Sequence, residues 1–280
     1  MFSLVHRKKE WLRVLSIPIG SLFNTLTGRR RKNNVVMFHL GRSGSTALGD
    51  VFRHQPDIHW DGEIYPFLYY NRATTYMEYT DLPSRYAKDY LKYRMAGRTK
   101  KYYGFECKPF HLRWLGLSVG EYVGFLKTLG VDRWILLERK NILRILVSQH
   151  VALYSGKWHP KRPEDVFKGT VEIPIRRINI DHEWISLREG LERLSAEWEA
   201  LKEALEQHAI KALIVDYDRD VKQDPMIAAK LVADHIGLRY RRVTSEYLRS
   251  TTAPLETLVS NFGDLKSELK GTRFEWMLNE

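Results

Sequence analysis

A glycine-rich stretch near the start of the chain carries residues that suit the binding of an anion. Residues 41–46 follow an apolar run, Val35 to Phe38. Two glycines allow a tight turn in which successive backbone N–H groups point at one oxyanion, and hydroxyls and a guanidinium add further donors. The stretch therefore predicts a loop that binds a phosphate or sulfate group. Its candidate ligands are Gly41, Arg42, Ser43, Gly44, Ser45 and Thr46.

This stretch differs from the loop that binds ATP or GTP, whose pattern is Gly-x-x-x-x-Gly-Lys-Ser/Thr. Counting back five residues from Gly44 gives His39 in place of the first glycine, and Ser45 replaces the lysine. The Gly-x-Gly-x-x-Gly pattern of dinucleotide-binding enzymes is also absent after this apolar run. A small-molecule kinase with an atypical phosphate loop remains an alternative.

A second pair of polar residues follows a later apolar run. Arg139 stands at the end of that run, and Ser148 follows nine residues later in a stretch that favours a helix. A nucleotide with phosphates at both its 3′ and 5′ positions needs two separate anion sites. The two stretches together could provide them.

These motifs resemble those of sulfotransferases that use 3′-phosphoadenosine 5′-phosphosulfate (PAPS). Residues 42–46 match that family's loop for the 5′-phosphosulfate, which reads Lys or Arg, any residue, Gly and two Ser/Thr. Arg139 and Ser148 match the Arg and Ser that bind the 3′-phosphate. The chain is most similar to bacterial carbohydrate sulfotransferases of the trehalose and nodulation-factor type. The likeness extends to residues 214–238, which include Tyr217 as a further cofactor-binding candidate, and to residues 254–262.

The resemblance implies an enzyme that transfers a sulfuryl group from PAPS to a hydroxyl of a carbohydrate or glycolipid by in-line displacement. Arg42 would stabilise the leaving 5′-phosphate, and Lys108 would donate to the transferring sulfonate. Many cytosolic members close the cofactor with a Gly-rich basic loop near the C-terminus. Here only residues 270–273 offer a basic loop, and Arg273 is given no site role.

The acceptor hydroxyl needs a base. Glu63 is the first candidate, in an expected loop 21 residues after Arg42, and Asp61 competes with it. His111 is the alternative base, because a histidine serves that role in cytosolic relatives. Residues 60–79 are rich in aromatic side chains that could contact a sugar, although core packing also explains them.

The elements that must position these residues follow from the apolar pattern. Short apolar runs predict strands at 35–40, 103–107, 134–138 and 212–217. Apolar spacing and capping residues predict helices at 46–54, 142–154, 181–208 and 225–236. The alternation favours an α/β, P-loop-like three-layer fold with a central, mostly parallel sheet flanked by helices. Ligands bind at the carboxyl ends of strands in such sheets, where both anion-binding motifs are expected.

Charge and composition limit the kind of partner. The chain has 280 residues, with 45 Lys and Arg against 34 Asp and Glu, and its net charge of +11 implies an anionic partner. The alternative to an enzyme is a non-catalytic basic module that binds nucleic acid or an anionic membrane. No nucleic-acid motif occurs, so we expect no nucleic-acid partner. Histidines and acids show no ligand spacing, so we expect no metal.

We expect the chain to divide into a basic N-terminal segment, 1–34, and a single domain, 35–280, which the resemblance implies is a sulfotransferase domain. Residues 1–32 could contact an anionic membrane peripherally, or form a surface helix or frayed tail. The single cysteine, Cys107, and the lack of Asn-x-Ser/Thr sites predict a cytoplasmic protein, at the inner face of the membrane if the basic segment contacts it.

Overall fold

The computed structural model describes residues 31–65, 84–180 and 183–279. Its central sheet contains five parallel strands in the order β2-β3-β1-β4-β7. The strands are β1 (Asn33–His39), β2 (Ile58–Glu63), β3 (Tyr102–Cys107), β4 (Val131–Glu138) and β7 (Leu213–Asp216). The α/β fold with a parallel sheet flanked by helices is confirmed, and so are the four predicted strands. β1 begins at Asn33, so the expected domain boundary after residue 34 falls inside a strand.

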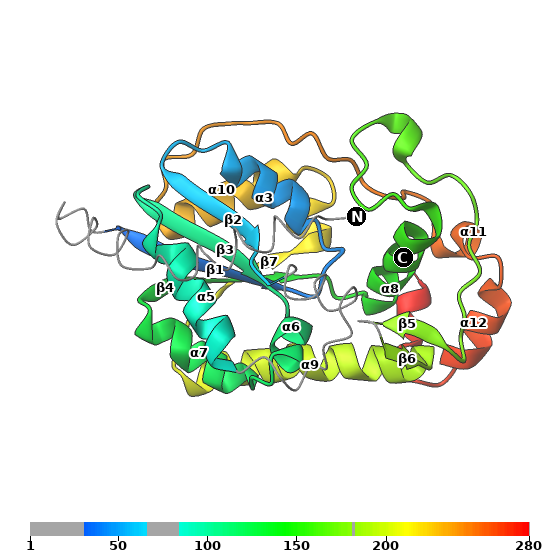
Figure 1. Ribbon diagram of the computed structural model, residues 1–280. Coiled ribbons are helices and arrows are strands. Elements are labelled where there is room, and N and C mark those ends of the chain that lie inside the picture. The colour runs from blue at the N-terminus through cyan, green and yellow to red at the C-terminus, as the bar shows by residue number, and fades with distance from the viewer. Residues whose placement is uncertain (1–30, 66–83, 181–182, 280) are drawn as a thin grey trace, which may run out of the picture.

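Helices cover both faces of the sheet (Figure 1). α3 (Ser45–Arg53) and α10 (Pro225–Ile236) lie on one face, and α5 (Ser84–Ala96), α7 (Val119–Thr128) and α9 (Leu187–Gln207) lie on the other. Side chains of β1 alternate between the two layers: Val35 and Met37 pack toward α3 and α10, while Val36 packs on the opposite side. Burial on both faces explains why β1 reads as a continuous apolar run.

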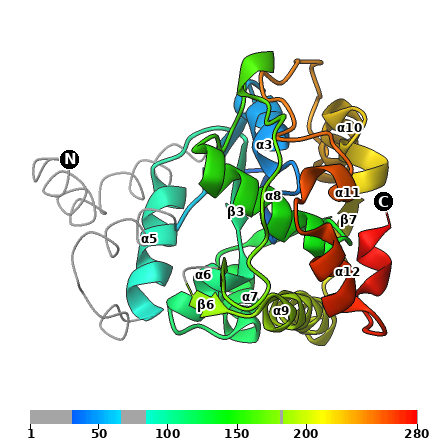
Figure 2. The same ribbon diagram turned by 90° about the vertical axis from the view of Figure 1, so that its right-hand side faces the viewer.

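A third cluster of apolar side chains lies beyond the carboxyl ends of the strands. It joins α8 (Ile142–Ser155), α11 (Leu255–Leu258), α12 (Phe262–Leu269), the first part of α9 and the hairpin of β5 (Ile178–Ile180) and β6 (Glu183–Ile185). Figure 2 shows α8, α11 and α12 from this side of the molecule. The remaining short elements are α6 (Pro109–Trp114), η2 (Pro163–Asp165), η3 (Tyr217–Val221) and η4 (Glu275–Leu278).

β2 is a strand that the apolar pattern did not predict, and it corrects the placing of Glu63 in a loop. Glu63 is the last residue of β2 and lies opposite Glu106 of β3. The pairing register shifts between Trp60 and Glu63, where Gly62 has a φ of 67°. The strand was missed because its sequence, Ile-His-Trp-Asp-Gly-Glu, has no continuous apolar run.

The helix predicted at 181–208 begins later, at Leu187. The Ser186 hydroxyl accepts the N–H of Glu189, whose carboxylate accepts the N–H of Ser186, and this capping box sets the start. Trp184, expected on the apolar face of the helix, lies in β6 and is 60% exposed. The helices predicted at 46–54, 142–154 and 225–236 are confirmed to within one residue at each end.

Two predictions concern residues that the structure does not describe. Residues 1–30 of the basic segment lie outside the described part of the chain, and so do the aromatic residues between positions 67 and 79. The aromatic residues of this region that are described, Trp60 and Tyr65, are buried in the core. In the described part of the chain, no helix combines the length and apolarity that crossing a membrane requires.

Candidate functional site

A cleft of about 1240 Å³ lies where the five strands of the sheet end. Every sheet strand contributes a lining residue at or just after its carboxyl end: Gly41, Glu63, Lys108, Arg139 and Tyr217. Of the residues predicted to bind the cofactor or to act in catalysis, all but one line this cleft. The exception, Ser43, is fully buried, and its hydroxyl has no hydrogen-bond partner among the described residues.

The glycine-rich loop adopts a conformation that its glycines make possible. Gly41 and Gly44 have φ angles of 91° and 83°, in the left-handed region that favours glycine. A Cβ on Gly44 would lie 2.6 Å from Val221 Cγ1, so the position is also closely packed. α3 begins at Ser45 without a side-chain cap. Its first backbone N–H groups are therefore suited to receive an anion.

Arg42 holds the loop against three other segments of the chain. Its Nε donates to Ser148 Oγ at 3.1 Å, its Nη1 donates to the Trp158 carbonyl at 2.8 Å, and its Nη2 donates to Ser250 Oγ. Its φ of 48° is unusual for a residue with a side chain. Burial and the nearby Arg139 lower the pKa of Arg42 to about 10, which leaves it charged at neutral pH. Arg42 thus already bonds protein atoms through all three nitrogens.

The second motif that we predict to bind an anion adjoins the first. Arg139 Nη1 donates to the Arg42 carbonyl at 2.9 Å, and its guanidinium lies 4.3 Å from the centre of the Tyr217 ring. Ser148 lies on α8, whose start is set by Asn141 accepting the N–H of Arg144 at 3.0 Å. The loop, Arg139 and Ser148 therefore form one connected wall of the cleft.

Three titratable side chains, Glu63, Lys108 and His111, face one another in the lining of the cleft. Lys108 Nζ lies 2.8 Å from Glu63 Oε1, and His111 Nε2 lies 3.9 Å from Glu63 Oε2. Burial alone would raise the pKa of Glu63, but the charges of Lys108 and the nearby histidines lower it to about 2. Burial and Lys108 lower the pKa of His111 to about 3. At neutral pH Glu63 is a carboxylate and His111 a neutral imidazole, so each can accept a proton.

Asp61 does not line the cleft and is engaged elsewhere. Its carboxylate accepts from Arg94 Nε at 3.0 Å, from Tyr103 Oη at 2.7 Å and from His59 Nε2 at 2.9 Å. Burial would raise the pKa of Asp61, but these donors, Arg94 foremost, lower it to about 2. The register shift at Gly62 separates Asp61 from the surroundings of Glu63. Asp61 is therefore a poor candidate for the base.

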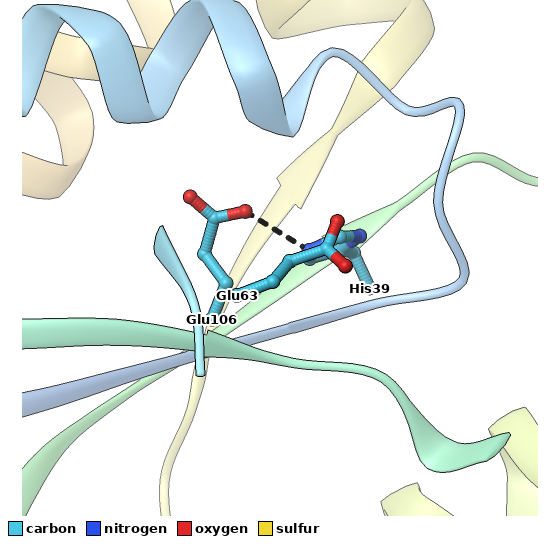
Figure 3. Close-up of side chains that lie close together, drawn as sticks. All are labelled: His39, Glu63 and Glu106. Atoms are coloured by element: carbon cyan, nitrogen blue, oxygen red, sulfur yellow. Dashed lines mark hydrogen bonds and ion pairs between the residues drawn. The ribbon is translucent and has the colours of Figure 1, made fainter. Parts of the chain in front are cut away.

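Sequence reasoning missed two buried residues beside the loop, His39 and Glu106. His39 Nε2 lies 3.2 Å from Glu106 Oε2 (Figure 3). His39 Nδ1 accepts the N–H of Gly41 at 3.0 Å. Glu106 Oε1 accepts Trp60 Nε1–H at 2.8 Å. Both missed residues are polar positions at the ends of otherwise apolar strands, which is the signal that could have drawn attention to them.

His39, Glu63 and Glu106 together offer three ligand atoms within 4.8 Å of one another, a spacing that could suit a metal ion (Figure 3). A metal needs a ring nitrogen with a free lone pair. In His39, however, Nδ1 accepts from Gly41, and Nε2 faces a carboxylate. Lys108 also pairs with Glu63. The donor set fits a hydrogen-bonded cluster better than a metal site, and the expectation of no metal stays a prediction.

A scan against models of known protein families finds no match for this chain, and a search of curated proteins also finds none. The functional conclusion rests on the residues of the cleft.

Proposed function

We propose that this protein transfers a sulfuryl group from PAPS to a hydroxyl of a carbohydrate or glycolipid. One observation carries the proposal: the glycine-rich loop, Arg139 and Ser148 line a single cleft at the carboxyl ends of parallel strands. The loop motif and the Arg–Ser pair are the two features in which the sequence resembles PAPS-dependent sulfotransferases. Nearly a hundred residues separate them in sequence, so the fold had to bring them together.

The cleft residues suit an in-line displacement at sulfur. The loop N–H groups and the start of α3 would hold the 5′-phosphosulfate, with Arg139, Ser148 and Tyr217 on the nucleotide side. Lys108 lies next to the loop, since a Cβ on Gly41 would be 3.6 Å from Lys108 Nζ. Its ammonium can therefore reach a sulfonate held there and stabilise charge that develops in the transition state.

Glu63 is placed to remove the proton of the acceptor hydroxyl. The Lys108 ammonium that would contact the sulfonate also pairs with Glu63, so Lys108 and the proposed base belong to one cluster. As the acceptor oxygen attacks sulfur, its proton passes to Glu63, and adenosine 3′,5′-bisphosphate leaves with the bond electrons. His111, whose Nε2 lies 3.9 Å from Glu63 Oε2, also lines the cleft and is the alternative base.

In this proposal Arg42 acts mainly by bonding other parts of the protein rather than by binding the phosphate directly. Because its three nitrogens bond Ser148, Ser250 and the Trp158 carbonyl, it fixes the walls of the cleft around the loop. Direct contact with the leaving 5′-phosphate would require it to exchange one of these bonds.

The first experiment is calorimetric titration with adenosine 3′,5′-bisphosphate, with AMP as the control. Tight binding of the bisphosphate over AMP would support both anion sites at once. Arg139→Ala should weaken the bisphosphate by at least about tenfold, equivalent to about 1.4 kcal/mol, and leave AMP nearly unchanged. Equal or absent binding of the two nucleotides would contradict the proposal.

The remaining alternatives make different predictions. A small-molecule kinase should be stabilised against heat by ATP with Mg²⁺, which the missing Gly-Lys pair of the loop argues against. A non-catalytic basic module should bind nucleic acid or anionic vesicles with strong salt dependence. Transfer of labelled sulfate from PAPS to a hydroxyl acceptor distinguishes the enzyme from both.

A further inference from the structure

A buried chain of hydrogen bonds links the loop to the sheet and takes no direct part in the proposed chemistry. Trp60 Nε1–H donates to Glu106 Oε1 at 2.8 Å, Glu106 Oε2 lies 3.2 Å from His39 Nε2, and Gly41 N–H donates to His39 Nδ1 at 3.0 Å. Trp60, Glu106 and His39 are 4%, 3% and 0% exposed. Three neighbouring strands, β2, β3 and β1, thus converge on the first residue of the loop.

The donors in this chain determine where the His39 proton lies. Gly41 N–H can donate only to an Nδ1 that carries no proton. The imidazole proton must then sit on Nε2, where it faces the Glu106 carboxylate, an acceptor. The second oxygen of Glu106 is occupied by Trp60 Nε1–H, which can only donate. The bond directions are consistent from Trp60 to Gly41 in this tautomer alone.

We propose that Glu106 is a positioning residue, which holds His39 in the tautomer that accepts the Gly41 N–H and thereby fixes the anion-binding loop. This bond holds Gly41 at its φ of 91°, and Gly41 and most of the loop residues after it line the cleft. The carboxylate also touches the helix that follows the loop, because a Cβ on Gly49 of α3 would lie 2.6 Å from Glu106 Oε1. Glu106 therefore fixes the position of the loop relative to α3.

The inference rests on the proposed function in one respect, that the loop holds the phosphosulfate of the cofactor. Its tautomer requirement is independent of any ligand. The ¹⁵N chemical shifts of the His39 ring in the wild-type protein report which nitrogen is protonated. We expect the proton on Nε2, and strong protection of the Gly41 amide against hydrogen exchange.

Glu106→Gln is the first variant. Its amide oxygen must accept from Trp60, so its NH₂ group faces His39 Nε2 and drives the ring proton to Nδ1. With a proton on Nδ1, His39 could no longer accept the hydrogen bond from the Gly41 N–H. We expect the ¹⁵N pattern to reverse or the Gly41 amide to lose protection, and adenosine 3′,5′-bisphosphate to bind at least about tenfold more weakly, as when about 1.4 kcal/mol is lost.

Two substitutions of His39 separate the two ring nitrogens. His39→Asn places an amide oxygen near the position of Nδ1 and can still accept from Gly41. His39→Gln reaches toward Glu106 but leaves the Gly41 N–H without its acceptor. We expect His39→Asn to keep most of the bisphosphate affinity and His39→Gln to lose at least as much as Glu106→Gln. A role in packing alone would give the two variants similar losses.

The outcomes separate this inference from the proposed function. A proton on Nδ1 in the wild type, equal affinities of the two His39 variants, or unchanged affinity in Glu106→Gln would overturn the inference. If the wild type shows the expected tautomer but binds no bisphosphate, the proposed function fails. Titration with inorganic sulfate then tests whether the loop holds an anion, with the same variants. If Glu106→Gln does not fold, the wild-type ¹⁵N shifts and the affinities of His39→Asn and His39→Gln still test the inference.

Discussion

Glu63, the proposed general base, faces the cleft but has a pKa far from the value that suits a base. Its carboxylate faces the cleft beside Lys108 and His111. The pKa of about 2 that Lys108 and the histidines impose lies far below neutral pH, where general bases work best. A sulfonate that attracts Lys108 toward the loop would weaken its hold on Glu63 and make the carboxylate more basic.

Replacement of Glu63 tests the assignment of the base. Glu63→Gln should lower turnover by about 10²- to 10⁴-fold, the usual contribution of general base catalysis. The affinity for adenosine 3′,5′-bisphosphate should change little, because an amide oxygen can still accept from Lys108. Labelled sulfate transfer and calorimetry measure the two quantities. Near-normal turnover in Glu63→Gln would indicate that His111 is the base. His111→Asn should then show the loss of turnover.

Local signals predict some elements accurately and leave others undetected. α10 was predicted with both ends correct because Asp224 caps its start, Pro225 opens it and Gly237 ends it. β2 was missed because Asp61, Gly62 and Glu63 interrupt its apolar residues. The start of α9 was placed too early because apolar spacing continues through Trp184 and takes no account of the cap at Ser186.

The same distinction applies to the site. The loop and the Arg139–Ser148 pair can be recognised in the sequence because each is a compact motif, and both line the cleft. The contact between His39 and Glu106 joins residues 67 positions apart, and no local pattern records it. The bonds that occupy Arg42 were also not predicted, because Trp158 and Ser250 reach it from distant segments.

Gly44 joins the loop to α3, and its replacement tests the demands of that junction. Gly44→Ala combines a left-handed φ of 83° with a Cβ that would meet Val221 at 2.6 Å. We expect a loss of about 3 kcal/mol in the free energy of unfolding, from backbone strain and overpacking together, and a loss of bisphosphate affinity. Urea denaturation and calorimetry check the two effects.

Gly116→Ala is the matched control for Gly44→Ala. Gly116 also has a left-handed φ, 62°, but no atom of the described residues lies within 4 Å of its added Cβ, and it is not among the residues that line the cleft. Gly116→Ala should lower the free energy of unfolding by only about 1 kcal/mol and leave the affinity for the bisphosphate unchanged. If the two variants behave alike, the close approach to Val221 is not what makes Gly44 necessary.

The Asp61 cluster ties β2 to α5 and β3, and its contribution to stability should depend on pH. Its folded-state pKa of about 2 lies below the ordinary value of 3.8. A group with a depressed pKa stabilises the fold above its unfolded-state pKa and loses that contribution as pH falls through the folded-state value. Asp61→Asn should therefore cost about 3 kcal/mol at pH 7, through loss of the buried pair with Arg94.

Urea denaturation at several pH values measures this effect. The stability difference between wild type and Asp61→Asn should stay constant from pH 7 to about pH 5 and narrow toward pH 3. Asp234→Asn is the control, because Asp234 forms an exposed pair with Lys230 on α10 and should cost less than about 1 kcal/mol. A difference that does not narrow in acid would show that Asp61 acts through packing rather than charge.

At the scale of the whole molecule, part of the positive charge lies where an anion would bind. The cleft is lined by eight Lys and Arg residues and only two glutamates. A lining that is mainly of one sign focuses the electrostatic field and would draw anionic ligands toward the strand ends. The positive lining of the cleft therefore accounts for part of the net charge of +11, although charge alone leaves open whether the ligand is a nucleotide or a nucleic acid.

Salt dependence distinguishes these two ligands. A bisphosphate enclosed by the cleft contacts partly buried cations, which salt screens weakly, so its affinity should fall by less than about tenfold between 50 and 200 mM salt. A nucleic acid that contacts six to ten phosphates would lose about 10³- to 10⁵-fold over the same range. Calorimetric titrations with adenosine 3′,5′-bisphosphate and with a DNA duplex at both salt concentrations make the comparison. A duplex that competes with the bisphosphate and shows the steep dependence would favour the basic binding module, because only an extended backbone releases so many counterions.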